Sequence, residues 1–162
     1  MYKYNTLADL LNRTPQAAAV IKGSSAYPKI NGMVYFSRTA SGVYVAADIH
    51  GLPDPTGECE SPVFGFHIHS GRACTGNASD AFGDAMSHYN PGTCKHPHHA
   101  GDLPPLFGCG GRAVSIFLTD RFTLTEIIGR TVIIHSSPDD FTTQPSGNSG
   151  TKIACGVIRA LG

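Results

Sequence analysis

Short runs of strand-forming residues, separated mostly by glycine, proline, asparagine or serine, recur along the chain from Ala17 onward. Runs of this kind are typical of β-strands joined by turns. The 19 glycines and 11 prolines are spread among these runs, which argues against long helices. We therefore expect an all-β fold, with strands over residues 17–23, 30–38, 42–50, 62–69, 111–118, 130–135 and 152–158.

Two long connections interrupt this pattern, from Ser70 to Gly110 and from Ser136 to Thr151. A tight turn over residues 39–42 precedes them and indicates an early hairpin. About seven short strands with two long connections fit a Greek-key β-sandwich or flattened barrel. Loops of this length in a compact domain are usually functional, so we expect the chemistry to lie in them.

The length of 162 residues is enough for one domain. Residues 6–13 begin with a capping threonine and space their leucines helically, which predicts a short helix in an N-terminal extension over 1–16, ahead of a β-domain over 17–162. The balanced net charge argues against nucleic acid or an acidic membrane as a partner. No apolar run is long enough for a membrane span, and residues 1–19 lack the uninterrupted apolar core of a secretory signal, so we expect a cytoplasmic location.

Six of the eight histidines fall between His67 and His99, and this enrichment suggests metal binding. On the expected strand over 62–69, alternation directs His67 and His69 to one face and the aromatic residues Phe64 and Phe66 to the other. Two imidazoles on one rigid strand can hold a metal. Taken alone, the pair is equally compatible with two ordinary surface histidines.

A second group of residues strengthens the evidence for metal binding, because three imidazoles and a carboxylate can form a tetrahedral ligand shell suited to Zn²⁺. Its members are His88, His96, His99 and Asp102. The alternative is a solvated, histidine-rich loop. His135 ends the strand over 130–135, and with His67, His69 and His88 it would complete four nitrogen ligands suited to Cu²⁺.

Five stretches of the chain resemble copper/zinc superoxide dismutase, and together they cover roughly residues 17–158. They are Gly65–His69, His88–Pro91, His99–Leu103, Gly129–His135 with Asp139 and Asp140 following, and Gly147–Val157. The resemblance implies a flattened eight-stranded barrel of immunoglobulin-like, Greek-key topology. It also implies an enzyme that converts superoxide into dioxygen and hydrogen peroxide.

The same resemblance implies a role for each matching residue. It gives copper to His67, His69 and His135, makes His88 the ligand shared by copper and zinc, and gives zinc to His96, His99 and Asp102. It makes Asp139 the carboxylate that links a copper histidine to a zinc histidine, and it pairs Cys74 with Cys155 in a disulfide. Copper would cycle between oxidation states while zinc orients His88, whose imidazole would take up and deliver a proton. A homodimer is compatible with the sequence but is not required by it.

The chain departs from the family at Lys152, where the family usually carries an arginine that guides the anion. The positive charge is kept, but lysine lacks the planar pair of N–H donors with which a guanidinium can bind a small oxyanion. The loop from His135 to Cys155 is shorter than in the eukaryotic enzymes of the family and lacks a cluster of guiding lysines and glutamates, which predicts weaker steering of the anion. The stretch from Cys74 to His88 is longer than in the family, and residues 77–85 within it have no assigned role.

Among the remaining candidates, we expect His98 to point to solvent and His50 to be structural. Cys94 could be a sulfur ligand, although a small buried residue is the favoured interpretation. Cys59 and Cys109 receive no role. Two other functions stay open at this point: a copper/zinc-binding or copper-delivery protein without turnover, and, with less support, a zinc hydrolase, whose metal needs an open position for water.

Overall fold

A computed structural model describes residues 12–55, 57, 60 and 62–162 of the chain. The helix expected over residues 6–13 lies almost entirely outside this part, as does Cys59. Within it the strands are β1 (Ala17–Gly23), β2 (Asn31–Thr39), β3 (Gly42–His50), β4 (Val63–Phe64), β5 (Phe66–His69), β6 (Leu106–Phe107), β7 (Arg112–Thr119), β8 (Thr131–His135) and β9 (Lys152–Ala160). The helical segments are η1 (Gly83–Ala85) and α2 (Leu124–Ile127), and neither is long and apolar enough to cross a membrane.

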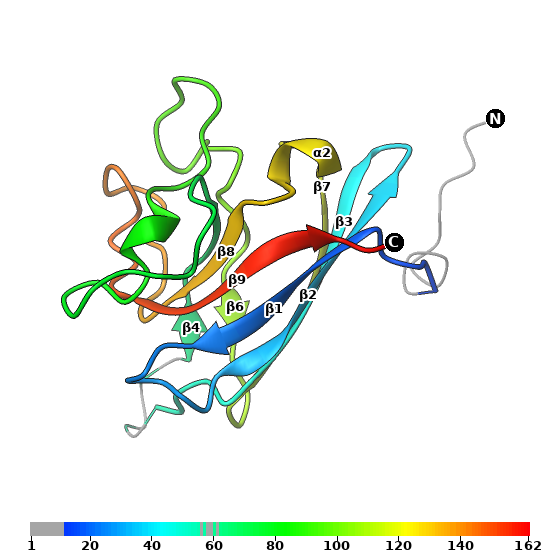
Figure 1. The fold of residues 1–162 in the computed structure, drawn as a ribbon. Coiled ribbons are helices and arrows are strands. Elements are labelled where there is room, and N and C mark those ends of the chain that lie inside the picture. The colour runs from blue at the N-terminus through cyan, green and yellow to red at the C-terminus, as the bar shows by residue number, and fades with distance from the viewer. Residues whose placement is uncertain (1–11, 56, 58–59, 61) are drawn as a thin grey trace.

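Seven strands form one antiparallel sheet in the order β5-β8-β9-β1-β2-β3-β7, and β4 pairs with β6 in a second, small sheet. The larger sheet is strongly curled (Figure 1). Because β4 runs directly into β5, and β6 leads into β7, the small sheet connects the two edges of the large one. The expectation of an all-β fold with very little helix is confirmed.

One expected strand, over residues 62–69, is divided in the structure at Gly65. The Gly65 amide donates a hydrogen bond to the Ser137 carbonyl oxygen, and its own carbonyl accepts one from the His135 amide, each at 2.8 Å. This glycine therefore ties β4 and β5 to the end of β8 and to the loop that follows it. Strand β6 was not expected from the sequence.

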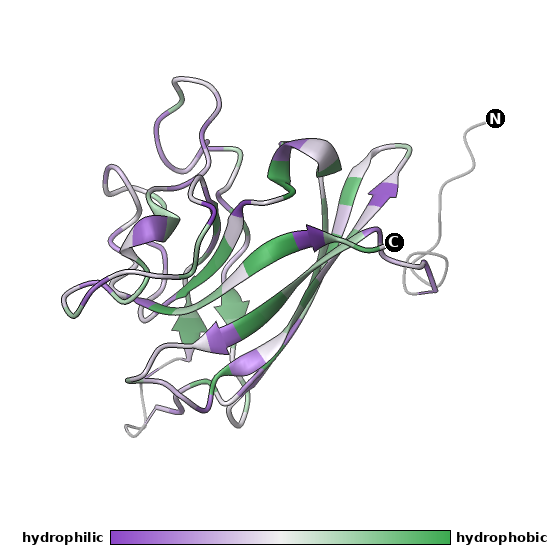
Figure 2. Cartoon of the chain, viewed as in Figure 1, coloured by the Kyte–Doolittle hydropathy of each residue, from purple (hydrophilic) through white to green (hydrophobic). Residues whose placement is uncertain are grey.

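The core lies inside the curl of the sheet. Figure 2 shows apolar residues recurring along β1, β8 and β9. Phe36, Phe66 and Ile134 are among its fully buried side chains. Burial of one such side chain stabilises the fold by about 1.5–3 kcal/mol. This core fixes the strands β5 and β8, which carry three of the histidines.

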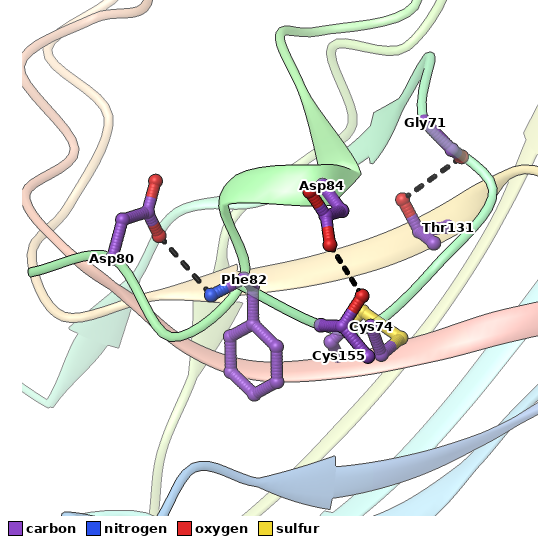
Figure 3. The surroundings of a disulfide bond; sticks show 8 residues. Gly71, Cys74, Asp80, Phe82, Asp84, Thr131 and Cys155 are labelled. Atoms are coloured by element: carbon purple, nitrogen blue, oxygen red, sulfur yellow. Dashed lines mark hydrogen bonds between the residues drawn. A yellow bond between two sulfur atoms is a disulfide. The ribbon is translucent and has the colours of Figure 1, made fainter. Parts of the chain in front are cut away.

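A second, smaller apolar cluster lies between the sheet and the loop after β5. It contains Phe82 and Ala85 from the loop and Ile133 and Cys155 from β8 and β9. Cys155 forms a disulfide with Cys74, so the pairing implied by the resemblance is confirmed (Figure 3). In Figure 1 this loop (green) and the loop after β8 (orange) gather on one side of the molecule, away from the C-terminus.

We predict that the double variant Cys74→Ala/Cys155→Ala loses about 4 kcal/mol of unfolding free energy, because the disulfide closes a loop across a sequence separation of 81 residues. Denaturant unfolding of oxidised wild type and variant measures this loss. Wild type treated with a reductant is the matched control and should behave like the variant. A loss below about 1 kcal/mol would contradict the prediction.

Candidate metal centre

The loop after β5 returns to the free edge of that strand and adds backbone pairs to it. The Tyr89 amide donates to the Ile68 carbonyl at 2.8 Å, and the Ile68 amide donates to the Gly101 carbonyl at 2.9 Å. Isolated β-bridges accordingly pair His69 with His88 and His67 with Asp102. The side chains of the loop are thus brought beside those of the strand.

Gly101 allows this close approach. A Cβ atom at this position would overlap with the Ile68 carbonyl oxygen and would come within 2.9 Å of the Tyr89 amide nitrogen. Any other residue would push the loop away from β5. The close approach of the loop to β5 therefore requires glycine at position 101, and the sequence alone did not reveal this requirement.

The structure brings the predicted ligands together in two groups. In each group, one possible ligand atom per residue lies within 4.8 Å of all the others, and every residue is buried. The first group is His67, His69, His88 and His135; the second is His88, His96, His99 and Asp102. His88 belongs to both. The alternatives of surface histidines and of a solvated loop are therefore wrong, because the long loops bury the histidine face of β5.

Hydrogen bonds fix the tautomers of two rings in the first group. His69 Nδ1 lies 2.8 Å from the Met86 carbonyl oxygen, and His135 Nδ1 lies 3.3 Å from the Gly150 carbonyl oxygen. A carbonyl oxygen only accepts, so each Nδ1 must carry the proton and each Nε2 a lone pair. The two Nε2 atoms face each other at 3.2 Å. Two lone pairs in this position repel each other unless a proton or a metal cation lies between them.

The other two rings of this group also turn a lone pair inward. His67 Nε2 donates to Asp139 Oδ2 at 2.8 Å, which leaves a lone pair on Nδ1. His67 Nδ1 and His88 Nε2 are both buried without a hydrogen-bond partner. Four imidazole nitrogens without protons therefore converge, a set that suits Cu²⁺.

The second group is built around the Asp102 carboxylate. His88 Nδ1 lies 2.7 Å from Asp102 Oδ1, and His96 Nδ1 lies 3.1 Å from Asp102 Oδ2. His99 Nδ1 is 3.4 Å from Oδ1. Since His96 Nε2 donates to Asp139 Oδ1 at 2.8 Å, its Nδ1 atom faces the carboxylate with a lone pair. Three nitrogens and one carboxylate fit a tetrahedral Zn²⁺ site.

Burial favours the neutral form of His67, His69 and His135. It lowers the pKa of His67, lowers that of His69 far below the usual value, and lowers that of His135 to about 3. Burial alone would raise the pKa of Asp139, but hydrogen bonds from His67, from the Phe141 amide and from His96 bring it down to about 2. Neutral imidazoles beside an ionised carboxylate are in the protonation states that bind metal.

Lys152 lies directly across the β8–β9 ladder from His135. It lines a cavity of 740 Å³ whose wall also includes His69, His88 and His135. Its Nζ atom lies 2.5 Å from Asp80 Oδ2, in the stretch over 77–85 to which the sequence assigned no role. Asp80 lies six residues after Cys74, and the sequence around it gives no signal for this contact.

The remaining histidines and cysteines differ in how well they agree with expectation. His98 is exposed, as predicted. His50 is also exposed and lies in neither ligand group; its Nε2 is 3.1 Å from Asp48 Oδ1. Cys94 is exposed and free, so its interpretation as a buried residue is wrong, because the surrounding segment 91–95 faces solvent. Cys109 is likewise exposed and free.

Comparison with known proteins supports the geometry. The sequence model of the family described as copper/zinc superoxide dismutase (SODC) matches residues 30–158. The chain therefore belongs to the copper/zinc superoxide dismutase family. Similar members are superoxide dismutase [Cu-Zn] of Deinococcus radiodurans, 33% identical over 82% of this chain and 79% of that protein, and superoxide dismutase [Cu-Zn] of Legionella pneumophila, 35% identical over 82% and 80%. Superoxide dismutase [Cu-Zn] 2 of Aquifex aeolicus is 34% identical over 81% of this chain and 80% of its own.

Membership of the copper/zinc superoxide dismutase family agrees with the two ligand groups. A family defined by copper and zinc needs two adjoining cation sites of different ligand type. The chain has one group of four imidazoles and one of three imidazoles with a carboxylate. The cofactors expected from the sequence, Cu and Zn, are compatible with both.

We predict that Asp139→Asn weakens zinc binding by about 10–100-fold. An asparagine has one acceptor oxygen, so it can no longer accept hydrogen bonds from both His67 and His96. Competition with a chromogenic chelator measures the affinity, and Asp120→Asn, which removes an exposed carboxylate outside both ligand groups, is the control. Equal zinc affinity in wild type and Asp139→Asn would contradict the prediction.

Proposed function

We propose that this protein converts two superoxide anions and two protons into dioxygen and hydrogen peroxide. In this proposal His67, His69, His88 and His135 hold copper, and His88, His96, His99 and Asp102 hold zinc. One observation carries the assignment: His88 is buried, with Nδ1 directed at Asp102 and Nε2 directed at the other three imidazoles. A single ring that faces two cation sites suits a paired centre.

Copper, when bound, supplies one-electron oxidation and reduction, while zinc has no redox chemistry and holds its ligands in place. The chain supplies the rest. His88 stays oriented through Nδ1, so its Nε2 could take up one of the two protons that the reaction consumes whenever this nitrogen is not bound to copper. Asp139 keeps His67 and His96 in the tautomers that bind metal.

The cavity gives the reacting anion a path to this ring set, since its wall includes His69, His88 and His135. Lys152 is the cation on that wall that can attract superoxide. An ammonium acts as a point charge and lacks the planar pair of donors that a guanidinium offers to an oxyanion. We therefore expect the protein to dismutate superoxide while binding anions less tightly than an enzyme with arginine at this position.

A second candidate function is copper/zinc binding or copper delivery with little turnover. The observation that favours it is the ion pair of Lys152 with Asp80, which occupies the ammonium that would otherwise attract the substrate. The two functions differ in one measurable property. Both predict two metal ions per chain, and only the first predicts rapid removal of superoxide.

We predict that protein loaded with copper and zinc removes superoxide in a pulse-radiolysis assay, and that His69→Ala lowers the rate at least about 100-fold. The variant loses a copper nitrogen but keeps every member of the zinc group, so zinc content should be unchanged. His98→Ala, which removes an exposed histidine, is the matched control and should keep full activity. Two metal ions per chain without activity above that of free copper would instead support the binding function.

We also predict that Lys152→Arg retains dismutation and strengthens inhibition by azide about threefold, because a guanidinium presents two donors to a small anion. Inhibition constants for both proteins measure the effect. Lys152→Gln, which removes the charge, should change inhibition in the opposite direction. Unchanged turnover together with unchanged azide inhibition in Lys152→Arg would show that this side chain does not contact the anion.

A further inference from the structure

Two residues of opposite charge face each other on the wall of the cavity that leads to the copper ligands. Lys152 begins β9, Asp80 lies in the loop between Cys74 and η1, and their side chains are paired at 2.5 Å. Among the described residues that line this cavity, they alone belong to the aspartate, glutamate, lysine and arginine types. The protein wall therefore carries one positive and one negative fixed charge, which cancel.

Asp80 is held in position by its own loop. Its Oδ1 accepts a hydrogen bond from the Phe82 amide at 3.1 Å, while Oδ2 accepts the one from Lys152 (Figure 3 shows the first of these). The Asp80 carbonyl oxygen accepts two more, from the amides of Asn77 and Gly83. Phe82 packs into the small apolar cluster beside Cys155. The carboxylate is thus anchored through the loop to the disulfide.

Both charges remain accessible to a ligand in the cavity. The Lys152 side chain is 16% exposed and the Asp80 side chain 41%. The hydrogen bond from Lys152 lowers the pKa of Asp80, so this carboxylate is ionised at neutral pH. An anion that enters the cavity meets an ammonium that already has a partner and a carboxylate that repels it.

We propose that Asp80 selects anions by charge, admitting the singly charged superoxide while disfavouring doubly charged anions such as hydrogen phosphate. Coulomb energy is proportional to the charge of the entering ion, so the same carboxylate repels a dianion twice as strongly as a monoanion. The identity of superoxide as the favoured monoanion rests on the proposed function. The charge selection itself rests only on the cavity and the ion pair.

The decisive variant is Asp80→Asn. Asparagine has nearly the same shape and keeps an oxygen that can accept from the Phe82 amide, but it removes the negative charge and leaves Lys152 unopposed. We expect the affinity for azide, a monoanion, to rise about threefold. The affinity for phosphate at about pH 8, where it is mostly a dianion, should rise about tenfold, since doubling the energy squares the factor.

The measurement uses protein loaded with copper and zinc at low ionic strength. Azide is titrated by the change in visible absorption of copper, and phosphate is titrated by its competition with azide. At about 1 M salt both differences between variant and wild type should disappear, because the screening length falls to about 3 Å. Should the protein retain no copper, phosphate binding is followed instead by the amide chemical shifts of Thr151 and Lys152, with the same tenfold gain expected.

Two controls separate charge from loop structure. Asp80→Glu keeps the charge and should keep the selectivity of wild type. Asp120→Asn changes the net charge equally at an exposed site that is not on the cavity wall, and should change neither affinity. Equal gains for azide and phosphate in Asp80→Asn, or no gain for either, would overturn the inference.

The outcome is independent of turnover. If wild type fails to remove superoxide while Asp80→Asn still gains affinity in the expected ratio, the proposed function is wrong and the charge selection stands. If wild type is active and the affinities do not change, the charge selection is wrong and the proposed function stands.

Discussion

The Asp139 carboxylate, shared between two buried histidines, is the interaction on which the metal centre depends. Each of its oxygens accepts a hydrogen bond at 2.8 Å, one from His67 Nε2 and the other from His96 Nε2. It thereby decides which nitrogen of each ring is free to bind a metal, and it joins β5 to both long loops. Gly147 lies so close that a Cβ there would overlap with this carboxylate, and its φ of 67° suits glycine.

The same arrangement makes the protein without metals electrostatically unfavourable in one place. Nitrogens of four imidazoles, those of His67, His88, His96 and His99, are buried without a hydrogen-bond partner. In addition, the Nε2 atoms of His69 and His135 face each other at 3.2 Å. Buried polar atoms without partners cost free energy, which a bound cation recovers. Metal binding and the folding of the two loops are therefore thermodynamically coupled in this chain.

Local pattern in the sequence was sufficient for most strands and for the ligand residues. The strands over 17–23 and 42–50 have the expected bounds, because alternation and turn residues act over a few neighbours. Long-range contacts could not be predicted in the same way. The burial of the histidine face, the break at Gly65, strand β6 and the partner of Lys152 all depend on segments that are distant in sequence.

Helix α2 was not predicted, although the sequence contains a local signal for it. Thr123 and Glu126 form a capping box at the start of α2, and the spacing of these two residues marks a helix start in the sequence. Cys94 was misjudged for a different reason. Cysteine is usually buried, but here it lies on an exposed segment of a loop in which the nearby His96 is buried.

The return of the loop to the free edge of β5 has a further consequence for the molecule as a whole. β5 is a terminal strand of the large sheet, and an open strand edge is a template for pairing with another chain. The amides and carbonyls of Tyr89, Gly101 and Leu103 occupy that template by bonding to Phe66 and Ile68. The backbone that delivers His88 and Asp102 to the metal sites also protects the sheet against aggregation through this edge.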